Sequence, residues 1–233
     1  MNNLAIIPAR SGSKGLKDKN IKNMNGKPLM SYTIDAALKS GVFSEVMVST
    51  DSEAYAAIAR EYGAQVPFLR SDIASADSTS TWDTVREVLK EYKSIGKEFD
   101  SFCILQPTSP LRREDDIIEA YRLYREKAEI AVISVCEAEH SPLWCGQLGE
   151  DMSLAGFIAP ENMRQRQSSG RYYRPNGAIY IVNTDSFSAD FFPYQKGSYA
   201  YIMRADRSID IDTELDFRIA EFLMRENMTN DQM

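Results

Sequence analysis

The sequence predicts an α/β protein whose doubly wound, mostly parallel sheet carries helices on both faces. Two observations lead to this prediction. Short apolar runs alternate along the chain with longer segments whose apolar residues recur at helical spacing. The runs are also continuously apolar, which is typical of strands that are buried on both faces of a sheet.

Five apolar runs are expected to form the sheet, and the first of them stops at Pro8. Because the runs alternate with helical segments, parallel pairing is favoured. The expected strands cover residues 4–7, 45–51, 101–106, 130–136 and 177–182, and a further short strand is expected at the start of 208–227.

The segments between the strands carry signals for the start and the end of helices. Pro28 suits a first helical turn, and Gly41 suits the end of that helix. Ser52 is expected to cap the next helix, which Gly63 terminates. The expected helices lie within 26–41, 52–63, 78–96, 113–127 and the second half of 208–227.

The regular alternation stops between about residues 137 and 175. This stretch is irregular and contains several arginines together with tyrosines and a tryptophan. A long excursion from a compact domain is usually functional or part of an interface. We therefore expect residues 1–233 to form a single domain in which about 137–175 is an insertion.

Composition excludes several classes of function. Lys and Arg total 27 against 34 Asp and Glu, and the net charge of −7 disfavours binding to nucleic acid or to anionic membranes. The apolar runs are too short to span a bilayer, and the N-terminus lacks the features of a signal peptide. We expect a soluble, cytoplasmic protein with neither a nucleic-acid nor a membrane partner.

Histidine and cysteine are scarce. The chain has one histidine, His140, and three cysteines without CxxC spacing. These residues predict reduced structural thiols instead of a disulfide framework or a zinc site. A single imidazole also makes a Ser-His-Asp hydrolase a poor hypothesis.

A glycine-rich, cationic loop follows the first strand. Gly12 and Gly15 allow the backbone to turn sharply and approach a ligand, while Arg10, Lys14 and Lys19 supply positive charge. Free N–H groups in such a loop form an anion-binding nest, so the loop predicts a polyphosphate site. The alternative is an ordinary loop with solvated cations.

The cationic loop matches neither of two well-known phosphate-binding motifs, because the chain contains no GxxxxGK[ST] and no GxGxxG pattern there. Asp51, at the end of the second strand, does resemble the ribose-binding acid of a dinucleotide fold. A nicotinamide-dependent oxidoreductase is therefore kept as an alternative.

Two aspartates near the C-terminus predict a metal site. Asp210 and Asp212 are two residues apart on an extended segment, so both side chains can point to one side. Mg²⁺ is commonly held by carboxylates together with phosphate oxygens. The alternative is a charged turn in which Asp212 or Thr213 caps the last helix.

Two further segments carry polar groups near strand ends. The segment LQPTSPLR offers the Gln106 amide beside two hydroxyls, or else forms a rigid turn with Arg112 at the next helix start. In the segment RYYRPNG, Arg174 can pair with a carboxylate, and Asn176–Gly177 is expected to form a turn.

These motifs, in their order along the chain, resemble those of the acylneuraminate cytidylyltransferases, the CMP–sialic acid synthetases. The resemblance covers about residues 3–225. The motif PARSGSKG also occurs in other sugar-acid cytidylyltransferases, whereas its combination with the last two motifs is more specific. The matching segments are IIPARSGSKG, KN at 19–20, VSTD, LQPTSPLR, RPNGAIYI and SIDIDTELD.

The resemblance implies an enzyme that joins CTP to the anomeric hydroxyl of a nine-carbon sugar acid, N-acetylneuraminate above all, and releases pyrophosphate. It implies Mg²⁺ as the cofactor. It also implies a homodimer in which about 137–175 is a dimerisation arm that reaches over the partner's site.

The resemblance further implies roles for individual residues. CTP would be bound by Arg10, Ser11, Gly12, Lys14, Lys19, Asn20, Arg70 and Ser80. The sugar acid would be bound by Gln106, Arg166, Arg174, Tyr180, Phe191 and Phe192. Asp210 and Asp212 would hold the metal, and Lys19, Arg10 and Asp212 would act in catalysis.

One departure from the family pattern bears on the sugar. After EHSPL this chain has Trp144, where several sialic acid members carry a lysine thought to meet the sugar. Legionaminate and pseudaminate therefore stay open as alternative substrates. A cytidylyltransferase for the eight-carbon acid Kdo is a further alternative, which RPNGAIYI and the long excursion disfavour. A non-catalytic nucleotide-binding protein is the alternative outside enzymes.

Overall fold

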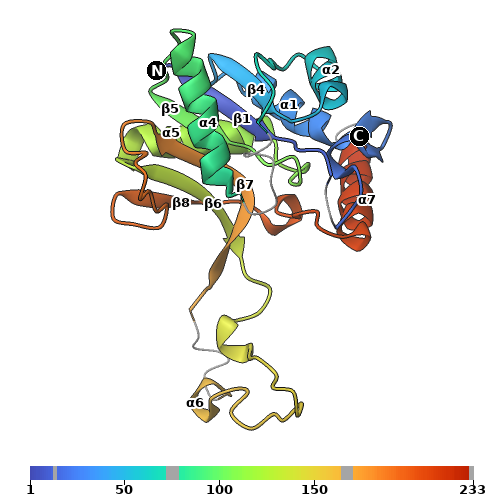
Figure 1. The fold of residues 1–233 in the computed structure, drawn as a ribbon. Coiled ribbons are helices and arrows are strands. Elements are labelled where there is room, and N and C mark those ends of the chain that lie inside the picture. Colours follow the sequence, from blue (N-terminus) through green and yellow to red (C-terminus); the bar gives the residue numbers. More distant parts are fainter. Residues whose placement is uncertain (13–14, 72–78, 164–169, 231–233) are drawn as a thin grey trace.

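Six strands form one mixed, mostly parallel sheet at the centre of the molecule (Figure 1). The structure is a computed structural model that describes residues 1–12, 15–71, 79–163 and 170–230. The strands are β1 (Asn3–Pro8), β4 (Glu45–Ser49), β5 (Ser101–Ile104), β6 (Ala131–Glu137), β7 (Tyr173–Asn183) and β8 (Ser198–Ile202), in the order β4-β1-β5-β7-β6-β8.

Strand direction divides the sheet into parallel and antiparallel parts. β1 lies parallel to both β4 and β5, so that Ile6 is opposite Met47 on one side and Ile104 on the other. β8 also lies parallel to β6, whereas β7 runs antiparallel to both of its neighbours. The predicted α/β class is confirmed. The sequence did not predict the reversed direction of β7 or the edge strand β8.

Helices cover both faces of the sheet, as predicted. Ala5 and Ile7 of β1 point to one face, where they join a core with α1 (Leu29–Ser40), α2 (Glu53–Glu61) and α5 (Glu114–Lys127). Leu4 and Ile6 point to the other face, where α4 (Thr81–Ser94) packs in front of the strands (Figure 1). Because side chains alternate between the two faces along β1, this strand contributes to two separate cores.

Local signals in the sequence set several helix ends. Ser52 accepts a hydrogen bond from the Tyr55 amide and caps α2, as predicted. Gly41 adopts the left-handed conformation at the end of α1, with φ of 63°. Ser80 and Asp83 form a capping box at the start of α4.

A third, smaller core attaches the C-terminal helix α7 (Glu214–Asn230) to the N-terminal part of the chain. Met24 and Leu29 pack there with Leu111, Ile211 and Phe217. The remaining elements are the hairpin strands β2 (Asn23–Met24) and β3 (Lys27–Pro28), the short helices η1 (Lys19–Ile21), η2 (Pro142–Trp144), η3 (Ala205–Arg207) and α6 (Pro160–Met163).

Two local predictions were wrong. Residues 208–212 contain no strand, because they are held by separate side-chain and main-chain contacts instead of a ladder. Asn176–Gly177 do not form a turn but lie within β7, where the pairing with β6 shifts register between Ile133 and Val135. Asn176 is buried at this bulge, where its side-chain oxygen accepts from the Ala178 amide and the Ser134 hydroxyl accepts from the Ile179 amide, so side chains replace ladder bonds that the backbone loses.

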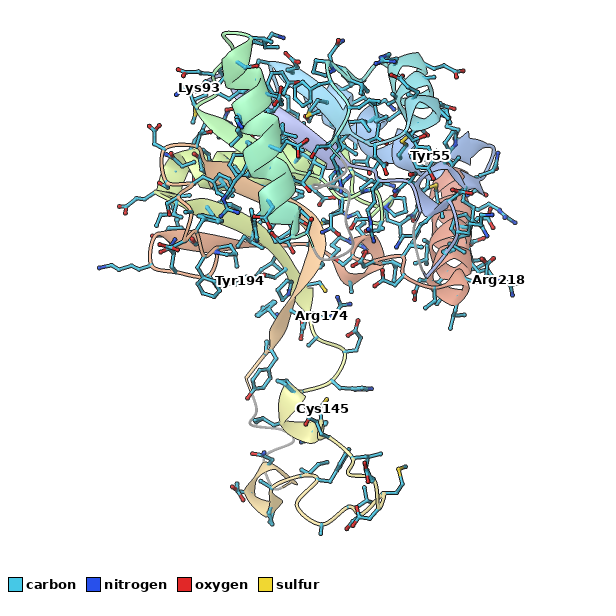
Figure 2. The ribbon with its side chains drawn as sticks, viewed as in Figure 1. Tyr55, Lys93, Cys145, Arg174, Tyr194 and Arg218 are labelled. Carbon is cyan, nitrogen blue, oxygen red and sulfur yellow. The ribbon has the colours of Figure 1, made fainter. Side chains whose placement is uncertain are left out.

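The irregular segment leaves the body of the molecule as an arm, whose described residues are 138–163 and 170–172 (Figure 1). Its root is the end of the β6–β7 pair, where Glu137 is opposite Tyr173 and the Ala138 amide donates to the Tyr172 carbonyl. Farther out, the Trp144 indole donates to the Asn162 carbonyl at 3.3 Å. Cys103 and Cys136 are buried in the sheet, as expected of structural thiols, and Cys145 lies on the arm (Figure 2).

Every helix in the described part of the chain is too short or too polar to cross a bilayer.

A buried arginine fixes the loop between β5 and α5. The Arg112 guanidinium donates to the carbonyls of Gln106 (3.2 Å) and Ala178 (2.9 Å) and to the hydroxyl of Thr33 (2.6 Å). Burial lowers the pKa of Arg112 to about 10. This result agrees with the structural alternative for Arg112, which joins α1, the β5–α5 loop and β7.

Replacing Arg112 with methionine tests this role. Methionine keeps much of the side-chain volume but leaves three acceptors without their donor, so the free energy of unfolding should fall by about 3 kcal/mol. The matched control is Arg122→Met on the exposed side of α5, which should change the value by less than about 0.5 kcal/mol. Urea denaturation measures both, and equal stability of the two variants would contradict the role.

Candidate functional site

The cationic loop after β1 meets the segment before α7. Lys19 donates to the carbonyl of Ile211 and lies 3.2 Å from Oδ1 of Asp212. The Gly15 backbone approaches so closely that a Cβ there would lie 2.8 Å from the Asp212 carbonyl oxygen. The two regions that the sequence predicts to share a phosphate site are therefore in contact in the fold.

Polar contacts fix the shape of the cationic loop at both ends. The Asn20 amide donates to the Arg10 carbonyl at 3.0 Å, which closes the loop on itself. Near its exit, the Tyr55 hydroxyl donates to the Asp18 carboxylate at 3.1 Å, where Asp18 takes a left-handed conformation. Asn20 thus shapes the loop in this structure, and its predicted contact with CTP stays a prediction.

Asp51 anchors the beginning of the same loop. It accepts hydrogen bonds from both the amide (2.7 Å) and the hydroxyl (2.9 Å) of Ser11. Burial acts to raise the Asp51 pKa, but the bonds from Ser11 outweigh it and the net pKa is lowered. The Ser11 amide is therefore engaged by protein, whereas Gly12 beside it has φ of 72° and open space around its Cα.

Arg70 and Ser80 both make protein contacts near the strand ends. Arg70 donates from Nε and from Nη2 to the hydroxyl and carbonyl of Ser49, and burial lowers its pKa. The Ser80 hydroxyl lies 2.8 Å from Asp83 in the capping box of α4. Their predicted contacts with the cytidine stay predictions.

Asp210 is the carboxylate best suited to a cation. Its Oδ1 is buried and has no hydrogen-bond partner among the described residues. Burial raises the Asp210 pKa and the charge of Asp212 adds to the increase, while a bond from Thr108 and the charges of Lys19 and Arg174 oppose it. A buried oxygen without a donor beside a second carboxylate fits a divalent cation.

The Asp212 side chain differs from that of Asp210 by being 78 % exposed. Ile211 between them is fully buried in the third core, which fixes the backbone from which both carboxylates project. Within the described residues, no group of three or more His, Cys, Asp or Glu side chains is placed to hold a metal ion. A cation at this pair would need further ligands from substrate or water, as Mg²⁺ commonly has.

The extended segment that carries Asp210 is held at several points. Arg207 pairs with the buried Asp116 at 3.0 Å, and the Ile211 amide donates to the Thr108 carbonyl at 2.9 Å. Asn176 adds a third point by donating to the Ser208 hydroxyl at 2.9 Å. These contacts position the segment without strand pairing.

Asn176 is the centre of a buried polar network that the sequence analysis missed. Its Oδ1 accepts from the Ser134 hydroxyl of β6 at 2.6 Å and from the Ala178 amide at 3.2 Å. The same side chain reaches Ser208, two residues before Asp210. Asn176 therefore links the β7 bulge to the candidate metal site.

Gly177 lies at the closest approach of three chain segments. A Cβ at this position would lie 3.1 Å from the Gln106 side-chain oxygen and 3.3 Å from Oδ2 of Asp210. Gly177 also has φ of 75°, which side chains rarely tolerate. Glycine here lets Gln106 and Asp210 converge.

A pocket beside Gln106 contains part of the predicted sugar site. Tyr180 lines it, and burial together with the neighbouring Tyr194 raises the pKa of Tyr180 to about 12. Trp82 contacts Tyr180 edge to face, with ring centroids 6.0 Å apart. The pocket is lined by Thr81, Trp82, Ile104, Gln106, Tyr180, Pro193 and Tyr194.

The two predicted phenylalanines have different environments. Phe191 is buried and packs on Trp82, with centroids 5.0 Å apart, so it supports the pocket from behind. Phe192 is exposed and packs against Tyr194 at 5.6 Å. Trp82 and Tyr194 carried no motif signal, because an isolated aromatic residue is more often core than ligand wall.

Arg174 lies where the arm joins the body (Figure 2). Its guanidinium contacts the Glu139 carboxylate through two bonds, of 2.9 and 3.4 Å, and the first of these raises the Arg174 pKa. The predicted carboxylate pairing of Arg174 is therefore made within the chain. Lys14 and Arg166 lie outside the described residues.

The family model described as Cytidylyltransferase matches residues 4–231, nearly the whole chain. This chain belongs to the cytidylyltransferase family.

Several curated relatives of this cytidylyltransferase act on different sugars, according to their names. The N-acylneuraminate cytidylyltransferase of Escherichia coli is 39 % identical over 93 % of this chain, but the match covers only 51 % of that protein. The CMP-N,N'-diacetyllegionaminic acid synthase of Legionella pneumophila is 36 % identical over 96 % of this chain and 97 % of its own length. The pseudaminic acid cytidylyltransferase of Campylobacter jejuni is 32 % identical over 97 % of this chain and 98 % of its length. The chain thus spans about half the length of the first relative and nearly all of the other two.

A solved structure has the same fold as this cytidylyltransferase. The structure of CMP:2-keto-3-deoxy-manno-octonic acid synthetase complexed with CTP aligns with a TM-score of 0.74 at 18 % identity, over 97 % of this chain and 100 % of that one.

Family membership favours nucleotidyl transfer over the nicotinamide-dependent alternative. The bonds from Ser11 also give Asp51 a structural role in this fold, where it anchors the start of the cationic loop.

Proposed function

We propose that this chain transfers CMP from CTP to the anomeric hydroxyl of a nine-carbon sugar acid and releases pyrophosphate. The observation that carries the proposal is the contact of the cationic loop with the aspartate segment, through Lys19 and Gly15. This contact brings groups suited to a triphosphate beside carboxylates suited to a divalent cation. Family membership and the names of the relatives support the reaction class.

We rank the candidate sugar-acid substrates in order of preference. N-acetylneuraminate comes first, and legionaminate, pseudaminate and Kdo follow. Trp144 is the reason for keeping the alternatives, since it stands where several sialic acid enzymes carry a lysine. The pocket with Gln106 and Tyr180 is the proposed sugar-acid site, and Trp82 and Tyr194 extend the predicted set.

Asp210 and Asp212 are proposed to hold Mg²⁺, and the buried Oδ1 of Asp210, which has no hydrogen-bond partner in the described part of the chain, supports the assignment. When bound, Mg²⁺ supplies neutralisation of phosphate charge and a lower pKa for a nearby hydroxyl. Ile211 and Asn176 contribute by keeping the segment in place, as described above.

The chemical step needs positioning and charge neutralisation more than covalent help. The sugar hydroxyl oxygen forms a bond to the α-phosphorus, the bond from that phosphorus to the bridging oxygen breaks, and pyrophosphate leaves. Lys19 and Arg10, on the cationic loop, are proposed to balance the charge that develops on the departing group. No side chain becomes covalently attached in this scheme.

The remaining residues of the cationic loop are proposed to maintain the loop conformation that binds phosphate. Gly12 leaves backbone space for a phosphate, while Ser11 and Asn20 hold the loop through Asp51 and the Arg10 carbonyl. Arg70 and Ser80 are proposed to lie near the cytidine, because the first contacts Ser49 at the end of β4 and the second caps the start of α4.

The arm is proposed to be a dimerisation element of a cytoplasmic homodimer. It projects from the body, and three large apolar side chains on it are exposed: Leu148 (48 %), Met152 (67 %) and Leu154 (68 %). Apolar groups gathered on a projecting segment are typical of an interface. Arg174 at the root of the arm would then lie between the catalytic body and a second copy.

The reaction is tested by release of pyrophosphate from CTP with a panel of sugar acids. We expect release with N-acetylneuraminate when Mg²⁺ is present and none after chelation. Legionaminate, pseudaminate and the eight-carbon acid Kdo form the rest of the panel, because the names of two relatives and of the solved structure include these acids. Fastest turnover with one of these acids would correct the substrate, and no release with any acid would reject the proposed activity.

Substitutions separate the roles of the two charged regions. Asp212→Ala should lower kcat by about a hundredfold or more while CTP still binds, since a metal ligand is lost. Lys19→Ala should also lower kcat, and an effect on KM alone would argue against its role with the leaving group. Steady-state kinetics and calorimetric CTP binding measure these effects. The controls are Asp115→Ala and Lys90→Ala, which change exposed charges on α5 and α4.

Sedimentation velocity tests the dimer. The whole chain should sediment with twice the mass of one chain, and the double variant Leu148→Glu with Leu154→Glu should sediment as a single chain because charge disfavours burial. The control is Ile95→Glu, at a site on the body that is 56 % exposed. A double variant that stays dimeric would exclude the apolar part of the arm from the interface.

A further inference from the structure

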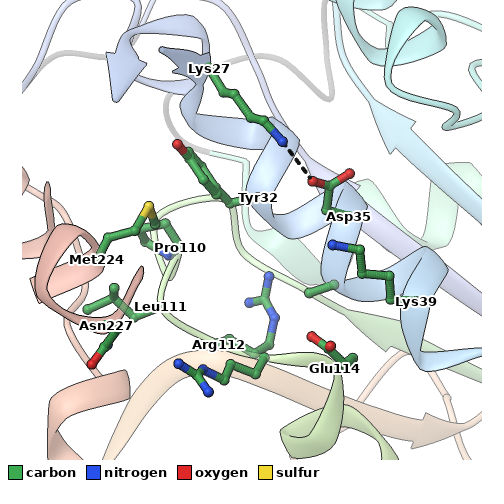
Figure 3. A pocket seen from close by; sticks show the side chains of 12 residues that line it. Lys27, Tyr32, Asp35, Lys39, Pro110, Leu111, Arg112, Glu114, Met224 and Asn227 are labelled. Carbon is green, nitrogen blue, oxygen red and sulfur yellow. Dashed lines mark hydrogen bonds and ion pairs between the residues drawn. The ribbon is translucent and has the colours of Figure 1, made fainter. Parts of the chain in front are cut away.

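A second pocket lies behind the β5–α5 loop, away from the site described above (Figure 3). Side chains from α1, α7 and the loop before α5 surround it, and Gln106, Lys19 and Asp212 are not among its lining residues. Its volume of about 220 Å³ is below the roughly 300–1,000 Å³ typical of drug-sized ligand sites. The pocket therefore suits a small molecule.

Positive charge prevails in this pocket although the chain as a whole is acidic. Four cationic residues line it together with two carboxylates: Lys27, Lys39, Arg112 and Arg113, and Asp35 and Glu114. The Asp35 carboxylate is already used by Lys27, whose Nζ lies 3.3 Å away (Figure 3). Lys39 has no ion pair with any residue that the structure describes, which leaves its charge available to a ligand.

One of the lining arginines also has an unused donor. Arg112 is 2 % exposed, and its Nε has no hydrogen-bond partner in the described part of the chain. A buried N–H without an acceptor costs free energy, and this cost favours an arrangement in which an acceptor is supplied. The loop between β5 and α5 thus carries a buried donor without a described partner, on a residue that lines the pocket.

The opposite wall of the pocket is apolar. Leu111 and Met224 belong to the third core and form part of the wall, and Tyr32 stands beside them. An apolar surface facing cationic side chains, Lys39 among them, matches a ligand with a small apolar body and one anionic group. Inorganic ions would leave the apolar wall unused.

We propose that this pocket binds a small organic anion, a phosphate or a carboxylate, and that its binding alters the sugar-acid site. Lys39 holds the anionic group and Leu111 and Met224 contact the apolar body. The effect on the sugar-acid site rests on the proposed function. The link is Arg112, which lines the pocket and also donates to the carbonyls of Gln106 and Ala178.

Calorimetry with phenyl phosphate tests binding without any turnover. The titration uses the Lys19→Ala protein, in which the proposed triphosphate site is weakened, and benzoate serves as the carboxylate arm. We expect one equivalent of at least one probe to bind, and Lys39→Glu in the same protein should weaken it about tenfold or more because the charge is reversed. The control Lys90→Glu, at an exposed position on α4, should leave binding unchanged.

The outcomes separate the pocket from the catalytic proposal. No binding of either probe at millimolar concentration, or equal binding by Lys39→Glu and Lys90→Glu, would overturn the pocket. Thermal unfolding checks that each variant is folded, and Lys39→Gln replaces Lys39→Glu if the latter is not. In the otherwise unaltered chain, the preferred probe should change the KM for the sugar acid unless Lys39 is substituted. Binding that leaves this KM unchanged would overturn the link through Arg112.

Discussion

The contact between Lys19 and the Ile211–Asp212 segment is the interaction on which the site depends. The two partners are nearly two hundred residues apart along the chain, and neither is part of the central sheet. Burial of Ile211 in the third core brings α7 against the N-terminal hairpin, and this packing places the aspartates beside the cationic loop. Hydrophobic burial at one end of α7 therefore brings the charged groups together, and the contacts of Lys19 with the Ile211 carbonyl and with Asp212 hold the segment beside the loop.

The β7 bulge provides the second constraint. Regular pairing along the whole of β7 would place side chains alternately on the two faces and leave Asn176 in the ladder. The shift of register instead buries the Asn176 amide between Ser134 and Ser208, so that a polar network joins the sheet to the segment before α7. Gly177 then allows Gln106 and Asp210 to approach each other. The bulge is thus a means of aiming side chains from three parts of the chain at one place.

Local sequence patterns predicted most of the helices and strands. They failed where a feature depends on interactions between residues far apart in the sequence. Buried strands such as 101–104 and capped helices such as 53–61 carry their signals in neighbouring residues. The direction of β7 depends on which strands it joins, and β8 is a largely exposed edge strand without a continuous apolar run. In the site, charged motifs indicated the cationic loop and the aspartates. Asn176 and Trp82 gave no such signal, because their roles come from partners that only the fold supplies.

Two buried polar atoms near the β5–α5 loop, Oδ1 of Asp210 and Nε of Arg112, have no hydrogen-bond partner among the described residues. Each is costly in the folded protein, since an unsatisfied buried group destabilises it by about 1–3 kcal/mol. A fold can bear such a cost where other contacts hold the group in place. Arg112 is held by its three other hydrogen bonds, and Asp210 is held because the segment before α7 is anchored through Ser208. A cation at Asp210 and an anion near Arg112 would each relieve one of them, so ligand binding would stabilise the fold by mass action as well as serve the reaction. The loop that carries Gln106 is common to both places, and this shared loop is the physical reason to expect that they influence each other.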